Sequence, residues 1–196
     1  SGEVRKAKGA PSALFLAGFI LYDKDKKTIQ PQHVRVIRGT DTVLAEEAKA
    51  GDHFIKIRNG ARWTAKTYHY AAFNAVQLPN RDLSPDVISA VKREGQIWTV
   101  SFGKPLQKSY PAGTKVRMHR AGSGWTYCAA ANKPLSVEWT TFTGKIKGSG
   151  FHRKGGEYYD RFRPGTRLVV PALTLRNTGK EPVKVFFRNL KLEEMK

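Results

Sequence analysis

Hydrophobic and polar residues alternate with a period of two along most of this chain. Seven segments show this alternation, or a concentration of β-branched and large apolar residues: 13–22, 53–58, 96–102, 115–120, 138–147, 166–177 and 183–192. Successive side chains on a β-strand point to opposite faces, so each segment is predicted to be a strand. Only two short windows, 44–50 and 85–91, have a helix-like pattern, and residues 87–91 could equally form a strand. The chain is therefore predicted to be all-β, as a sandwich or a barrel.

Turn-forming residues separate the predicted strands. Residues 23–27 and 176–180 are rich in Asp, Asn, Gly and Lys, and both are typical of hairpin loops. His33 follows Pro31 and is expected to end a turn. Gly18 is unusual inside the strand 13–22, because glycine has no side chain to pack. We expect it to mark a β-bulge.

The composition indicates a soluble, strongly basic domain. The chain has 196 residues, of which 40% are hydrophobic, which is enough for one good core or two small ones. Its net charge is +19, and basic residues exceed acidic ones in each of the parts 1–40, 41–120 and 121–196. No isolated basic tail accounts for the charge. A folded domain of this kind attracts polyanions over its whole surface.

Cysteine usage and the absence of a long apolar run give weaker information on location. Cys128 is the only cysteine, so an intrachain disulfide is excluded, which favours a reducing compartment without excluding secretion. No apolar run is long enough to span a membrane, and we expect no membrane partner. The chain opens at Ser1 in what looks like the approach to a strand. It is therefore expected to be part of a larger polypeptide.

The most informative stretch is 95–137, which contains six Lys or Arg residues and no Asp or Glu. Within it, the predicted strand 115–120 alternates basic and apolar residues. Strand geometry would place Arg117 and His119 on one face with Lys115, while Val116 and Met118 face inward.

Aromatic residues follow these cations. Arg120 ends the strand, and a Gly-Ser-Gly sequence leads to Trp125 and Tyr127. Cations beside exposed rings suit a ligand that is negatively charged and has flat faces, such as a sulfated or uronic polysaccharide or a nucleic acid. The alternative is that both rings pack as core beneath the alanines at 129–131.

A second basic group occupies a Gly-rich loop between two predicted strands. Its members are His152, Arg153, Lys154, Tyr158, Tyr159, Arg161 and Arg163. Long loops on β-sandwiches commonly carry function, and we select Arg153 as a candidate ligand contact. A solvated loop anchored by its two tyrosines is the alternative.

Several short motifs resemble a known family. The sequence AGD-x-x-IKI at 50–57 and YPAGTKV at 110–116 are similar to small β modules of secreted and phage-surface proteins. The flanking parts, EWTTF at 138–142, FRPGT at 162–166 and 185–194, resemble galactose-binding-like jelly-roll carbohydrate-binding modules. The resemblance implies a jelly-roll sandwich of residues 1–40 and 121–196, interrupted by a smaller β-barrel-like or β-hairpin unit at 41–120.

The same resemblance implies a location and a context. It is to uncharacterised modules appended to polysaccharide-degrading systems, so an extracellular or cell-surface protein is expected. No binding residue is carried over from the family, because the unit at 41–120 interrupts the sandwich.

Catalysis and metal binding receive less support from the residues. Acidic residues are scarce, which disfavours a glycoside hydrolase with its two carboxylates. A polysaccharide lyase remains an alternative, with a Tyr, His or Lys as base and a cation to stabilise the enolate. Its two candidate triplets are Arg117, His119 and Tyr127, and His152, Arg153 and Tyr158. The histidines lack zinc-site spacing, and Asp23 with Asp25 is a weak calcium signal, so we expect no metal and no cofactor.

These observations together predict non-catalytic binding of an acidic polysaccharide. Single-stranded nucleic acid is a less favoured partner, because no recognised nucleic-acid-binding motif is present. The expected ligand contacts are Arg117, His119, Arg120, Trp125, Tyr127 and Arg153.

Overall fold

The protein is all-β, as the sequence predicts. The structure is a computed structural model, and it describes residues 1–131, 134–150, 161–177, 179 and 181–194. Within these residues twelve strands form four antiparallel sheets, and a 3-10 turn, η1 (Pro31–His33), is the sole helical element. No helix in the described part is long and apolar enough to cross a membrane.

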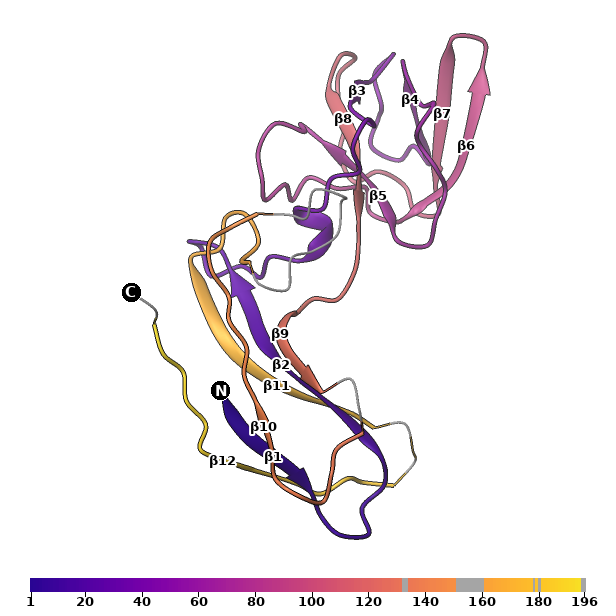
Figure 1. The fold of residues 1–196 in the computed structure, drawn as a ribbon. Coiled ribbons are helices and arrows are strands. Elements are labelled where there is room, and N and C mark those ends of the chain that lie inside the picture. Colours follow the sequence, from indigo (N-terminus) through magenta and orange to yellow (C-terminus); the bar gives the residue numbers. More distant parts are fainter. Residues whose placement is uncertain (132–133, 151–160, 178, 180, 195–196) are drawn as a thin grey trace.

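Two of the sheets, A and B, pack face to face (Figure 1). Sheet A has the order β10 (Thr140–Phe142), β1 (Gly2–Lys6), β12 (Val185–Arg188), and sheet B has the order β11 (Leu168–Asn177), β2 (Ala13–Tyr22), β9 (Thr126–Ala131). Val4 and Phe187 of sheet A meet Phe15 and Ala17 of sheet B in a shared core. Along β2, Phe15 and Ala17 are buried and alternate with partly exposed residues, as expected for a strand with one face in the core.

Two further sheets, C and D, lie at the opposite end of the molecule (Figure 1). Sheet C has the order β3 (Thr42–Val43), β8 (Lys115–Arg120), β5 (His69–Phe73), and sheet D has the order β4 (Phe54–Ile57), β7 (Ile97–Phe102), β6 (Ile88–Glu94). Their core includes Ile57, Phe73 and Met118, all fully buried. Sheets C and D use residues 42–120, whereas sheets A and B use residues before 23 and after 125. That these ranges are separately folding domains stays a prediction.

The two groups of sheets are joined by hydrogen bonds as well as by the chain. Arg81 Nη2 donates to the Asp23 carboxylate at 2.6 Å and to the carbonyl of Thr28 at 3.0 Å. The backbone N–H of Lys27 donates to the same carboxylate, and together with Arg81 it holds the pKa of Asp23 below its usual value. Asn80 N–H also donates to the His33 carbonyl at 2.6 Å.

Some sequence predictions differ from the structure. Neither 44–50 nor 85–91 is helical, and residues 88–94 form β6, in agreement with the strand alternative for 87–91. The strand expected at 138–147 is limited to β10. These short windows have only one apolar face to bury, and the neighbouring strands provide a ladder of backbone partners that an isolated helical turn lacks.

The bulge expected at Gly18 is confirmed. The register between β2 and β9 shifts between Ala17 and Gly18. A Cβ atom at Gly18 would collide with the carbonyl oxygen of Thr126 and would lie 2.7 Å from the Cα atom of Tyr127. Glycine therefore lets β9 approach β2 closely at the start of the strand that carries Tyr127.

Replacement of Gly18 should destabilise the protein. We expect Gly18→Ala to lower the free energy of unfolding by about 1–3 kcal/mol, because backbone atoms of β9 must move to admit the methyl group. Urea denaturation measures this change. Gly9→Asn is the matched control, since Gly9 has open space around it and Asn tolerates its positive φ. Equal losses for the two variants would contradict the close approach.

Candidate functional site

The strand β8 carries the first candidate residues, and its two faces are only partly as predicted. Val116 and Met118 face inward and are buried, as expected, and Lys115 is exposed. Residues 35–37 pair with β8 along its edge, and on the opposite face the Gln32 carbonyl of η1 contacts the His119 side chain. Ile37 N–H donates to the Met118 carbonyl at 2.9 Å. The predicted open cationic face is therefore largely closed.

His119 is the clearest correction. It is fully buried, so the expectation that it is displayed to a ligand is wrong. Its Nδ1 atom lies 2.6 Å from the carbonyl oxygen of Gln32, and its Nε2 atom accepts from Arg117 Nε at 3.0 Å. Because a carbonyl only accepts, Nδ1 carries the proton and Nε2 has the free lone pair. These partners require a neutral imidazole.

Arg117 lies beneath the surface beside this histidine. Its side chain is 11% exposed, and Nη1 lies 4.0 Å from the Asp41 carboxylate, which is a loose ion pair. Nη2 is buried and has no hydrogen-bond partner within the described part of the chain. The guanidinium thus supplies positive charge close to the surface but offers little area for direct contact.

Arg120 has the exposure that Arg117 lacks. Its guanidinium carbon lies 4.7 Å from the centroid of the Tyr68 ring, and both residues are exposed. Ala121 N–H donates to the Tyr68 carbonyl at 2.8 Å, which holds the two segments together. Arg120 has no carboxylate within ion-pair distance among the described residues. Tyr68 was not among the predicted residues, because it precedes β5 and lies far from β8 along the chain.

Trp125 and Tyr127 are both partly exposed, so neither ring is sealed in the core. Their ring centroids are 6.3 Å apart, with an interplanar angle of 55°. Tyr127 lies opposite Gly18 of β2 at the bulge. The structure thus brings a pair of tilted aromatic rings to the connection between β8 and β9.

A buried arginine fixes the loop that carries Trp125. Arg163 is 2% exposed, and its guanidinium donates to the carbonyl oxygens of four residues at 2.6 to 3.4 Å: Ile29, Ser123, Gly124 and Trp125. Arg163 was grouped with the anion-binding loop in the sequence analysis. That part of the prediction is wrong, because its donors are used inside the fold.

The remaining candidate, Arg153, lies outside the described residues, as do the other members of its loop from His152 to Tyr159. Arg161 is exposed. The predicted role of this loop stays a prediction.

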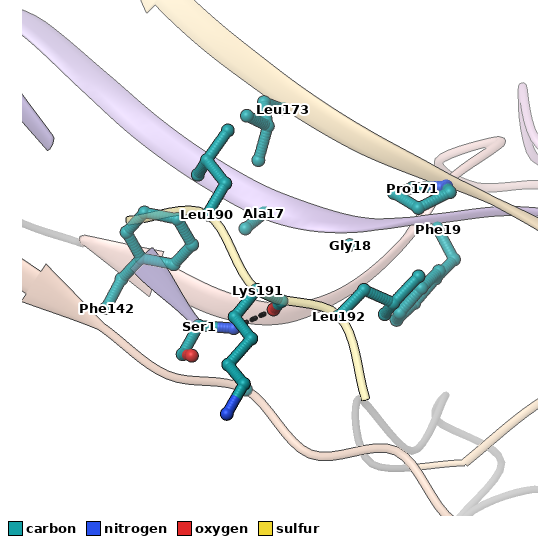
Figure 2. A pocket seen from close by; sticks show the side chains of 11 residues that line it. Ser1, Ala17, Gly18, Phe19, Phe142, Pro171, Leu173, Leu190, Lys191 and Leu192 are labelled. Atoms are coloured by element: carbon teal, nitrogen blue, oxygen red, sulfur yellow. Dashed lines mark hydrogen bonds between the residues drawn. The ribbon is translucent and has the colours of Figure 1, made fainter. Parts of the chain in front are cut away.

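An apolar groove lies elsewhere, between sheets A and B (Figure 2). It has a volume of about 230 Å³, and Phe142, Leu173, Leu190 and Leu192 line it. Its polar neighbour is the terminal amine of Ser1, which donates to the Lys191 carbonyl at 2.9 Å. These apolar walls do not fit a charged, polar ligand of the kind that the exposed cations would bind.

Positive charge over the surface is poorly compensated. Seven Lys or Arg side chains of the described residues lie within 4.0 Å of a carboxylate. Most of the others there have no carboxylate that close. No group of three potential metal ligands occurs among the described residues. The exposed cations can attract anions and donate hydrogen bonds to them.

Comparison with known proteins adds no relative: no family model matches the chain, and neither does a curated protein or a solved structure. The resemblance to jelly-roll carbohydrate-binding modules accordingly stays a prediction.

The buried histidine predicts a pH dependence of stability. Burial lowers the pKa of His119 to about 4, whereas an unfolded histidine titrates near 6.5. Between these values the unfolded state binds the extra proton, so stability is present above pH 6.5 and is lost as the pH falls. We expect the free energy of unfolding to be about 2 kcal/mol lower at pH 5 than at pH 7.5 from His119 alone.

Urea denaturation at the two pH values measures this difference. His119→Gln should reduce the difference, whereas His53→Gln, at an exposed histidine, should retain it. An unchanged pH slope in His119→Gln would show that His119 is not the titrating group.

Proposed function

We propose that this protein binds an acidic polysaccharide without catalysing a reaction on it. The observation that carries the proposal is the exposed pair of Arg120 and Tyr68, in which a cation with no carboxylate partner in the described part lies over an exposed ring. A guanidinium that lies over a ring can keep the N–H groups at its own edge free. It is therefore ready to donate paired hydrogen bonds to a sulfate or a carboxylate.

The pair of Trp125 and Tyr127 supports a sugar as the ligand. Both rings are partly exposed and tilted against each other. Aromatic rings with one polar end suit surfaces that are partly apolar and partly wet, and the C–H faces of sugar rings are of that kind. The buried Arg163 holds the loop in place, which reduces the entropy lost on binding.

The whole-molecule charge supports an anionic partner over a neutral one. The net charge is +19, and it is spread over the chain. Such a field speeds encounter with polyanions. The wider setting, a jelly-roll module within a larger secreted polypeptide, belongs to the same proposal.

The arrangement gives little support to the lyase alternative. A base must reach the proton it removes, but His119 is fully buried and both of its nitrogens are engaged. The second triplet, His152, Arg153 and Tyr158, lies outside the described residues.

Two substitutions test the proposed surface. We expect Arg120→Ala and Trp125→Ala each to weaken binding to heparin by about tenfold, which corresponds to about 1.4 kcal/mol, because each removes one direct contact. Arg58→Ala is the control, since Arg58 is exposed just after β4 of sheet D and its loss changes the net charge as Arg120→Ala does. Calorimetry measures the affinities, and circular dichroism verifies folding.

The same calorimetric assay tests which class of polymer the protein binds. Heparin, a uronic polymer, dextran and a poly-dT oligonucleotide are compared at one ionic strength. The proposal predicts binding to the first two and none to dextran. Tighter binding to poly-dT, lost in Trp125→Ala, would replace it with single-strand binding.

Incubation with uronic polysaccharides tests catalysis separately. Cleavage by a lyase leaves an unsaturated sugar that absorbs in the ultraviolet. We expect no increase in absorbance with the wild-type protein. A steady increase that persists in His119→Gln but is lost in Tyr158→Phe would instead establish a lyase in the 152–158 loop.

A further inference from the structure

A second group of cations and rings lies on the outer face of sheet A. Side chains directly opposite each other on paired strands share a face, and the register pairs Glu3 with Arg188 and Arg5 with Phe186. Val4 and Phe187 occupy the inner face and pack in the core. The outer face therefore carries Arg5, Phe186 and Arg188.

These residues form a continuous ladder in which cations and rings alternate. Its order is Lys184, Phe186, Arg5, Trp139 and Arg188. The cation lies 5.3 Å from the ring centroid in the first contact, and 5.1, 4.8 and 4.2 Å in the next three. Each contact of this kind contributes about 0.5–1 kcal/mol at an exposed site, so the ladder holds its cations in fixed positions.

The ladder has an excess of positive charge. Arg188 donates to both oxygens of Glu3, at 2.9 and 3.0 Å, and Asn189 donates to the same carboxylate at 2.6 Å. These hydrogen bonds from Arg188 and Asn189 lower the pKa of Glu3, so it stays ionised. Arg5 and Lys184 have no carboxylate within ion-pair distance in the described part of the chain. Arg5 Nε is buried without a hydrogen-bond partner there.

The geometry favours one class of anion. Guanidinium groups already lie over the Trp139 ring, which leaves less of that ring for stacking by a nucleic-acid base. What the face offers is N–H groups from Arg188 in β12 and from Lys184 just before this strand, and both residues are exposed. Closely spaced sulfates or carboxylates along a chain match such a row.

We propose that the outer face of sheet A is a second contact surface for the same acidic polysaccharide. This inference rests on the proposed function, and it adds a site formed by Arg5, Lys184 and Arg188. Sheet A lies at the opposite end of the molecule from sheets C and D (Figure 1). Two separate surfaces for one repetitive polymer raise the affinity for long chains far above that of either alone.

The test uses short heparin oligosaccharides, for which each surface binds its own molecule. The variant Arg5→Met/Lys184→Met removes two charges but keeps the apolar stems on the rings and the pair of Arg188 with Glu3. Lys92→Met/Lys104→Met is the matched control, since both lysines are exposed on the other sheets. Calorimetry measures the number of oligosaccharides bound per chain.

We expect two oligosaccharides per wild-type chain, one in Arg5→Met/Lys184→Met, and two in the control. Affinity for full-length heparin should fall at least tenfold in the ladder variant and at most about twofold in the control. The double variant Arg120→Ala/Trp125→Ala should also bind one oligosaccharide per chain.

The failures are distinguishable. One oligosaccharide per wild-type chain, lost in Arg120→Ala/Trp125→Ala and kept in the ladder variant, would overturn this inference and leave the proposed function intact. If oligosaccharide binding were lost in the ladder variant and kept in Arg120→Ala/Trp125→Ala, the ladder would be supported as a binding surface. The proposed surface at Arg120 would then be overturned. Binding of no acidic oligosaccharide would overturn both.

Discussion

A buried guanidinium organises the region on which the functional proposal depends. Arg163 donates to the carbonyls of Ile29 and of the loop 123–125, so segments distant in sequence share one side chain. Burying such a charge is costly unless its donors are satisfied, and the carbonyl oxygens satisfy them. The position of Trp125 follows from this contact. The whole fold, and not the loop sequence alone, therefore sets the position of this side chain.

The strands themselves follow from local pattern. The bounds predicted for 13–22 and 115–120 agree with β2 and β8, because alternation and β-branched residues act over a few positions. The bulge at Gly18 could be predicted, because glycine has no side chain to pack within a strand. The window 85–91 was ambiguous, because its pattern fits a helix as well as a strand at 87–91. At 88–94, the ladder with β7 decided the structure, and no local signal reports such a partner.

The candidate site was less predictable, since it depends on contacts between distant segments. Alternation placed His119 on an open face, but the residue is fully buried, and its ring contacts the Gln32 carbonyl of η1. Tyr68 reaches Arg120 from the residue just before β5. The ladder on sheet A joins Arg5 to residues more than 130 positions away, and only strand register brings them together. A basic surface with aromatic residues could be predicted from the sequence. Which of these residues are exposed depends on the fold.

The two proposed surfaces, at Arg120 and on sheet A, are alike. Each has cations that lie over aromatic rings on a β framework, and each has few neutralising carboxylates. Affinity for an acidic polymer should then come largely from displaced counterions. The most direct measurement is the affinity of the wild-type protein for heparin over a range of salt concentrations. The account predicts that the logarithm of the affinity falls steadily with the logarithm of the salt concentration. Binding to a neutral glycan that persists unchanged at high salt, with no binding to heparin, would contradict it.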